Sequence, residues 1–297
     1  MQHNFKWQTP NWLRVLCLTL LVGLAGAGAK AALINTYTFV PSTGTYTSIS
    51  GTTSTATGDD GTQTGIPLGF TFNYNSTAYT TIAITTNGAA SFSGTGPSWT
   101  NGLNPSPLAT TLAPFWDDHN QTGGTIQYTT TGTAPNRVFT VQWANIHIGG
   151  SGSSANPTGS FQMKLYETSN QVQFVYGTFA AMSGVSASIG LTGASGNFIS
   201  VTPGAPPTAS IVTANNAIAA NTFLPSGTIY TFAPPTVLPC SGTPAPGNTL
   251  ANATPTTLSV CSGSTVNFSL QTLTSGSGVT YQSVSYTHLT LPTNREV

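Results

Sequence analysis

Apolar residues alternate with small or polar residues without a break from Ile66 to Tyr74. A period of two residues places one set of side chains on a buried face of a β-strand and the other on a wetter face. Shorter runs of this kind recur, and together they predict strands over residues 66–74, 79–85, 89–92, 125–130, 138–148, 161–166, 172–176, 187–191, 198–201 and 228–232. No stretch after residue 33 shows a helical period. The sequence therefore predicts an all-β protein whose antiparallel sheets stack as a β-sandwich.

The connections between these strands are of two kinds. Asn87-Gly88 predicts a compact hairpin, because Asn-Gly tolerates positive φ at both turn positions. The short link Glu167–Asn170 predicts a second antiparallel hairpin. Three other connections are long and polar, and loops of this length are usually functional or disordered. We therefore expect a partner to be met at residues 93–111, 149–160 and 203–226.

Charged side chains are scarce, at 4% of the chain against roughly 25% in an ordinary soluble domain. Two basic and five acidic residues lie between residues 33 and 282, a balance of −3: Asp59, Asp60, Asp117, Asp118, Arg137, Lys164 and Glu167. So few ionisable groups leave little material for acid–base catalysis, phosphate binding or nucleic-acid binding. The negative balance also argues against a polyanionic partner. Disorder is excluded by 14 Phe and 10 Tyr residues and by the alternating apolar runs.

Residues 1–31 read as a signal peptide, with cleavage after Ala29 or Ala31. Lys6 and Arg14 precede an uncharged apolar run over residues 15–29. This run is shorter than the ~20 residues that span a membrane, so no transmembrane segment is expected in the mature chain. The sequence predicts a secreted or cell-surface protein.

The sequence predicts a change of organisation after residue 233. Residues 234–239 form a proline-rich linker, and residues 240–282 resemble the start of an immunoglobulin-like repeat that is too short to be stable alone. Cys240 and Cys261 are the only cysteines of the mature chain, and they pair either with each other or with partners beyond the printed sequence. Residues 283–297 break the pattern and resemble a translated adapter sequence, although a native C-terminal strand is the alternative.

The densest cluster of polar groups follows the apolar segment that ends at Trp116. Asp117, Asp118 and Asn120 could supply oxygen ligands to Ca²⁺, and Asp59-Asp60 could complete such a site from elsewhere in the sandwich. The alternative is that these side chains bond the backbone of turns, as short acidic side chains often do. We favour the turn, because the ligand set is incomplete and lacks the glycine spacing of a calcium loop.

No catalytic residues are predicted. His119 and His147 are the only histidines between residues 33 and 282, and no nucleophile elbow, zinc-protease helix or phosphate-binding loop occurs. A carboxylate pair for glycosidase chemistry is not supported by any motif. Among the tryptophans, Trp116 and Trp143 read as core residues. Trp99, in a polar loop, is a candidate for stacking on a sugar ring or, alternatively, an anchor folded back on the sandwich.

Five segments together resemble a known family: IPLGFTF at 66–72, TNGAASF at 86–92, LAPFWDD at 112–118, VFTVQW at 138–143 and FQMKLYE at 161–167. Residues 34 to 233 are similar to the nidogen-like β-sandwich module. More closely, they resemble the N-terminal module of large cell-surface proteins that Gram-negative bacteria export by type IX secretion, where immunoglobulin-like repeats and a sorting domain follow. The resemblance implies an extracellular adhesive or scaffold module, and it supplies no catalytic residues.

Three hypotheses about function follow. The first is a secreted or cell-surface adhesive or structural module that binds an extracellular protein or polysaccharide. The second is a lectin-like carbohydrate-binding module, and the third is a non-catalytic appendage of a secreted hydrolase. The sequence downstream of residue 297 would separate the first from the third, because further repeats favour adhesion and a catalytic domain favours the appendage.

Overall fold

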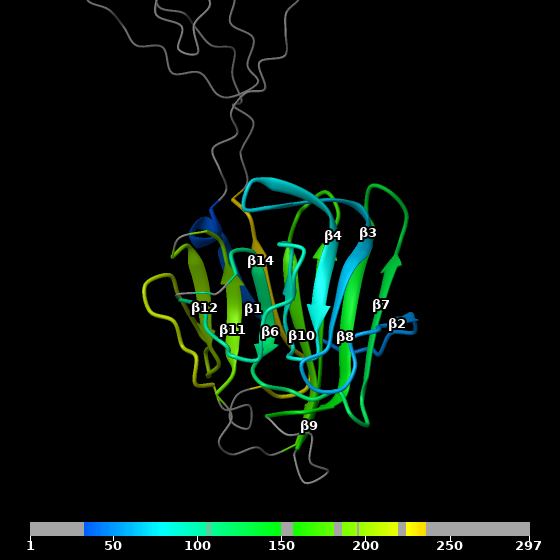
Figure 1. Ribbon diagram of the computed structural model, residues 1–297. Coiled ribbons are helices and arrows are strands. Elements are labelled where there is room, and N and C mark those ends of the chain that lie inside the picture. The colour runs from blue at the N-terminus through cyan, green and yellow to red at the C-terminus, as the bar shows by residue number, and fades with distance from the viewer. Residues whose placement is uncertain are drawn as a thin grey trace, which may run out of the picture. The chain divides into compact units, whose positions relative to one another are not determined.

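The computed structural model describes residues 33–104, 106, 108–149, 157–180, 186–194, 196–218 and 224–235. These residues form two seven-stranded antiparallel sheets that face each other (Figure 1). The only helical element among them is the single 3-10 turn Ile34–Thr36. The all-β antiparallel sandwich is therefore confirmed. The signal peptide, the immunoglobulin-like segment, both cysteines, the tail and all of the linker after Pro235 lie outside the described residues.

Neighbouring strands in each sheet come from distant parts of the chain. Sheet A runs in the order β1 (Thr38–Thr43), β14 (Thr228–Ala233), β10 (Val172–Phe179), β9 (Thr158–Tyr166), β8 (Val138–His147), β7 (Thr125–Thr131) and β2 (Thr52–Thr53). Sheet B runs in the order β13 (Thr208–Ser210), β12 (Phe198–Thr202), β11 (Ser188–Thr192), β6 (Thr111–Trp116), β5 (Ala90–Ser91), β4 (Thr77–Thr85) and β3 (Thr62–Tyr74). The first and last long strands, β1 and β14, pair with each other and close the described chain on itself.

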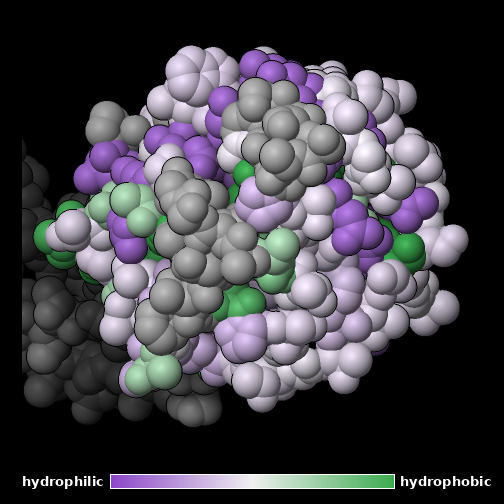
Figure 2. Space-filling model, turned by 90° about the horizontal axis from the view of Figure 1, so that it is seen from below, coloured by the Kyte–Doolittle hydropathy of each residue, from purple (hydrophilic) through white to green (hydrophobic). Residues whose placement is uncertain are grey.

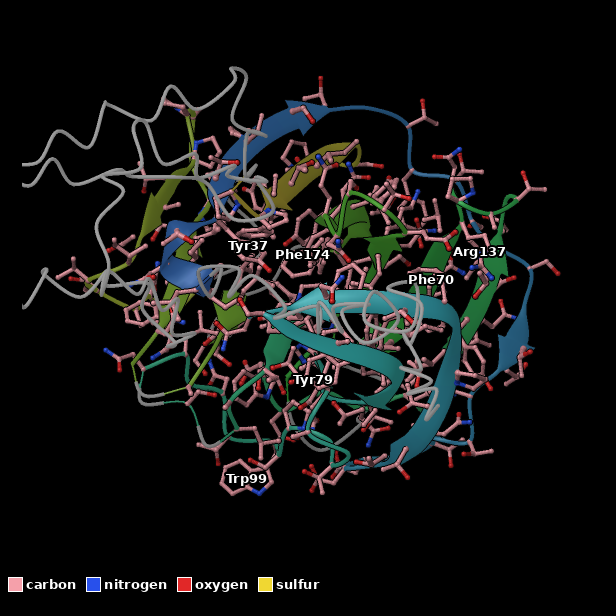
Figure 3. The ribbon with its side chains drawn as sticks, turned by 90° about the horizontal axis from the view of Figure 1, so that it is seen from above. Tyr37, Phe70, Tyr79, Trp99, Arg137 and Phe174 are labelled. Atoms are coloured by element: carbon pink, nitrogen blue, oxygen red, sulfur yellow. The ribbon has the colours of Figure 1, made fainter. Side chains whose placement is uncertain are left out.

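The core between the sheets is built from the alternating apolar residues that the sequence analysis identified. Trp143 of sheet A is fully buried, stacks on Phe161 with ring centroids 5.2 Å apart, and donates a hydrogen bond of 2.8 Å to the Thr85 carbonyl of sheet B. The Tyr176 hydroxyl crosses the same interface and donates to the Pro114 carbonyl at 2.7 Å. Each large apolar side chain buried here contributes about 1.5–3 kcal/mol to folding. Phe174 lies in this layer between the ribbons (Figure 3).

The Asn87-Gly88 hairpin forms between β4 and β5, but the prediction that both residues take positive φ is wrong. Only Gly88 does, at +68°, and three residues lie between the Thr85 and Ala89 pair that closes the turn. A type I turn followed by one left-handed glycine matches the sheet twist in a three-residue loop. A Cβ atom at Gly88 would also lie 2.1 Å from the Phe115 carbonyl oxygen, so the position requires glycine. The side chain of Asn87 makes hydrogen bonds to other segments.

A second hairpin, between β3 and β4, was not recognised as a turn in the sequence. Asn75 and Ser76 have φ of +49° and +63°, as a two-residue type I′ turn requires. The expected Glu167–Asn170 hairpin between β9 and β10 does form. It brings Glu167 beside Arg137 at the start of β8.

Two of the three predicted loops are shorter than expected. β9 begins at Thr158, inside the predicted connection 149–160, and β13 lies inside the predicted connection 203–226. β1 and β2 were also missed. These strands lack alternating large apolar residues: five of the six residues of β1 are exposed, and none of the three β13 residues is buried. They are held by backbone pairing at sheet edges, which leaves no hydrophobic period in the sequence.

Candidate functional site

The acidic turn after β6 is organised by Asp117, which is 7% exposed. Its Oδ1 accepts hydrogen bonds from the Asp118 amide at 2.9 Å and the Ser186 hydroxyl at 3.3 Å. Its Oδ2 accepts from the Ser186 amide at 3.0 Å. The carboxylate therefore fastens the end of β6 to the segment that leads into β11, across 69 residues of sequence.

Asn87 joins this turn to the Asp59-Asp60 turn. Its side-chain amide donates to Asp60 Oδ1 at 2.9 Å, and its Oδ1 accepts from the His119 amide at 2.9 Å. Its backbone carbonyl accepts from the Asp117 amide at 3.3 Å. Asn87 was predicted only as a turn former, but its side chain also makes these contacts. The sequence carried no signal for this role.

The two acidic turns are thus brought together, as the sequence analysis allowed. Burial raises the pKa of Asp118, and the neighbouring carboxylates Asp59, Asp60 and Asp117 raise it further. Asn120, by contrast, uses its Oδ1 to accept from the Thr122 amide at 2.8 Å. Within the described ranges, no group of three or more His, Cys, Asp or Glu side chains is arranged to hold a metal ion. The contacts of Asp117 and Asn120 are those of turns, and a calcium ion there stays a prediction.

His119 is completely buried beneath this turn and is held as the neutral ring. Its Nδ1 accepts a hydrogen bond from the Gly149 amide at 3.2 Å, so the ring proton is on Nε2, which donates to the Phe115 carbonyl at 2.9 Å. The ring also stacks on Phe115, with an interplanar angle of 9°. Burial lowers the pKa of His119 to about 4, although Asp117 acts in the opposite direction. A neutral histidine with both nitrogens occupied is a structural element of the turn.

Trp99 is 55% exposed in the loop between β5 and β6. Figure 3 shows it beyond sheet B, pointing away from the two layers. The anchor of the loop is its neighbour, because the Ser98 carbonyl accepts a 2.8 Å hydrogen bond from the indole N–H of Trp116. Trp116 is buried as expected, but in a separate cluster with Ala89, Leu103 and Ala113 and not between the sheets. The loop thus holds Trp99 outward next to a fixed backbone.

Trp116 takes this position because β6 contains an irregularity that the sequence did not reveal. Opposite β11, Ala113 pairs with Gly190 and Trp116 pairs with Ser188, so β6 has one more residue than its partner in this interval. A β-bulge of this kind re-aims the side chains that follow it. Phe115 therefore points into the main core, whereas Trp116 points to the outside of sheet B.

Arg137 is the other group whose role the sequence did not show. Its guanidinium forms two hydrogen bonds to the Glu167 carboxylate, donates to the Gly69 carbonyl, and lies 5.6 Å from the centre of the Phe70 ring. The hydrogen bonds from Arg137 lower the pKa of Glu167 to about 2. Figure 3 shows Arg137 beside Phe70 of sheet B. The pair joins the two sheets at the β3 edge and neutralises both charges.

Comparison with protein families assigns the described domain. The family model named NIDO-related matches residues 36–234, which is two thirds of the chain. The chain belongs to the NIDO-related family. Searches of curated proteins and of solved structures found no match. Membership of the NIDO-related family confirms the resemblance to a nidogen-like module, and it indicates an extracellular module of a non-catalytic kind. Export by type IX secretion and the following immunoglobulin-like repeat stay predictions.

No helix among the described residues is long and apolar enough to cross a membrane.

Proposed function

We propose that this NIDO-related domain is an adhesive or structural contact module of a larger secreted or cell-surface protein. The observation that carries the proposal is Trp99, a large aromatic side chain that projects from a loop fixed by Trp116. Tryptophan is the residue type most enriched among the energetically dominant contacts of protein interfaces. Such a residue on a rigid loop binds a partner with little loss of conformational entropy.

The rest of the surface supports contact in place of catalysis. The end of the molecule in Figure 2 presents mostly residues of intermediate or hydrophilic hydropathy, with apolar residues scattered among them. The buried titratable groups near the loops are engaged in turn contacts: Asp117 binds Ser186 and His119 binds Phe115 and Gly149. Two predictions from the sequence are part of the proposal: the signal peptide over residues 1–31, which supports export, and the immunoglobulin-like segment from residue 240, which supports a multidomain chain.

Adhesion of protein-coated beads tests this proposal. Beads carrying the full chain or Trp99→Ala are washed under flow over immobilised collagen, fibronectin, laminin, cellulose, chitin and dextran. We expect retention of the wild-type beads on at least one surface and a loss of at least about tenfold in the number of retained beads with Trp99→Ala. Equal retention of both bead types, or no retention on any surface, would contradict the proposal.

A lectin-like module is the second candidate, and the same residue favours it. The loop from Ser93 to Thr110 contains no charged residue, so Trp99 is surrounded in sequence by Ser, Thr, Gly and Asn groups that suit neutral sugar hydroxyls. Retention confined to cellulose, chitin or dextran would favour this candidate. Retention confined to the protein surfaces would favour adhesion to protein. Sequence downstream of residue 297 would test the third hypothesis, an appendage of a secreted hydrolase.

A further inference from the structure

The outer face of sheet A carries a row of polar side chains that crosses four strands. Lys164 on β9 lies between the core residues Met163 and Leu165, so its side chain points away from the core. It pairs in register with Thr140 on β8 and with Gln173 on β10. Gln173 in turn pairs with Thr231 on β14. These four side chains therefore lie side by side on one face, at the strand spacing of ~4.8 Å.

Hydrogen bonds fix the part of this row around Gln173. The Tyr166 hydroxyl donates to Gln173 Oε1 at 2.9 Å, and Gln173 Nε2 donates to the Thr231 hydroxyl at 3.1 Å. The amide is therefore oriented by partners on both sides. Gln173 and Thr231 are partly exposed and present amide and hydroxyl groups in fixed positions, whereas Thr140 is buried.

Lys164 is the unexplained group in this row. It is half-buried, and burial lowers the pKa of its ammonium group. Within the described part of the chain, Lys164 has neither an ion pair nor a hydrogen bond, since the one ion pair there is Arg137–Glu167. A partly desolvated cation without a partner costs free energy. Among the described residues, no carboxylate forms an ion pair with Lys164 that would offset this cost.

The structure also shows how the negative charges of residues 33–282 are distributed relative to Lys164. Asp59, Asp60, Asp117 and Asp118 gather around Asn87, and Glu167 is neutralised by Arg137. None of the five carboxylates contributes to the shifted pKa of Lys164. The negative balance that argued against a polyanionic partner therefore does not describe this face, where Lys164 is the one charged residue that the described chain places outside an ion pair.

We propose that the outer face of sheet A binds a carboxylated polysaccharide, with Lys164 pairing with a uronate carboxylate and Gln173 and Thr231 meeting sugar hydroxyls. A peptide is disfavoured, because peptide recognition uses a free sheet edge, an apolar groove or an arginine cluster, and this row lies within a seven-stranded sheet. The site is independent of Trp99, which projects beyond sheet B (Figure 3). Failure of the Trp99 proposal would therefore leave this one standing.

Binding of the full chain to polygalacturonate, alginate and hyaluronate tests the proposal by affinity gel electrophoresis. Fully methyl-esterified polygalacturonate is the matched ligand without carboxylates. We expect binding to at least one of the three polyanions, and Lys164→Gln to weaken that binding at least about tenfold. Lys164→Arg keeps the charge and should bind within about threefold of wild type. Val212→Ser, at a position just after β13 of sheet B that is 80% exposed, is the control variant and should bind as wild type does.

A second variant keeps the proposal testable if Lys164→Gln does not fold. Gln173→Glu places a carboxylate beside Lys164 on the neighbouring strand, and it should abolish binding while the melting temperature stays within a few degrees of wild type. Wild-type binding by Lys164→Gln or by Gln173→Glu would overturn the proposal. Binding to none of the three polyanions, or equal binding to the methyl ester or to poly-glutamate, would overturn it as well.

Discussion

The two outer faces of the sandwich are covered in opposite ways. Sheet B is covered by the loop between β5 and β6, which packs Leu103 against Ala113 and the indole of Trp116. Sheet A is covered by the segment from Gly44 to Gly51, which is held through polar contacts. Gln162 Nε2 donates to the Thr47 carbonyl at 2.7 Å, and Gln142 Oε1 accepts from the Ile49 amide at 3.0 Å.

This difference has an energetic consequence. Burial of a tryptophan removes a large apolar area from water, whereas a neutral hydrogen bond contributes only about 0.5–1.5 kcal/mol net. The polar cover is also incompletely satisfied, since Tyr46 Oη and Gln162 Oε1 are buried without a hydrogen-bond partner among the described residues. The loop over sheet B is therefore a stable platform. The segment from Gly44 to Gly51, which we call the strap, is held more weakly over sheet A and leaves a polar surface beside it.

Removal of the anchor over sheet B should have the largest effect. Trp116→Ala deletes a fully buried side chain and its hydrogen bond to Ser98, and we expect a loss of about 3–5 kcal/mol in the free energy of unfolding. Urea denaturation measures this loss. Trp99→Ala, in the same loop, is the control and should change stability by less than about 0.5 kcal/mol. Similar losses in the two variants would show that the loop is held by Trp99 and would break the comparison.

Acid should act next most strongly, through the buried histidine beside the sheet B loops. The pKa of His119 is lowered to about 4 in the folded state, against about 6.5 when it is unfolded. The neutral ring is thus stabilised by folding: its contribution is complete above pH 6.5 and is lost as the pH falls toward 4. A shift of this size corresponds to about 3 kcal/mol.

Urea denaturation between pH 7 and pH 4 tests the His119 effect. His119→Gln is less stable at neutral pH, but it removes this titration and should flatten the pH dependence across that interval. A wild-type slope that persists in His119→Gln would assign the acid sensitivity to other groups.

Most of the fold could be predicted from sequence because its strands carry the two-residue period. β3, β8 and β9 each place large apolar residues at alternate positions. β8 forms close to its predicted limits, whereas β3 and β9 end where predicted but begin earlier, at Thr62 and Thr158. β1, β2 and β13 could not be found, because their residues are mostly exposed and their order depends on pairing with strands distant in sequence.

The candidate site was less accessible to sequence analysis. The acidic residues and Trp99 were identified by type, but their contacts depend on long-range geometry. Asn87 meets Asp60 and His119 only because the β4–β5 turn has one positive φ angle. Trp116 leaves the main core only because β6 contains a bulge. Neither feature has a period or motif that a single sequence displays.

The acidic turn should contribute less to stability than the tryptophan anchor. Asp117→Ala removes three hydrogen bonds, two that join the end of β6 to Ser186 and one from the Asp118 amide, and we expect a loss of about 2 kcal/mol. We also expect calcium to leave the melting temperature unchanged, because the Asp117 oxygens are used by the turn. A bound ion would instead add about 2.7 kcal/mol at a hundredfold excess over its Kd. A calcium-dependent rise that Asp117→Ala abolishes would overturn the turn interpretation.

Removal of the polar anchor over sheet A should have the smallest effect. Gln162→Ala deletes the bonds to Thr47 and Gln142, but it also removes a buried oxygen that has no partner among the described residues. The two contributions oppose each other, so we expect a loss of about 1 kcal/mol in urea denaturation. Gln173→Ala, on the same face but outside the strap, is the matched control. A loss for Gln162→Ala as large as that for Trp116→Ala would show that hydrogen bonds hold sheet A's cover as firmly as apolar packing holds that of sheet B.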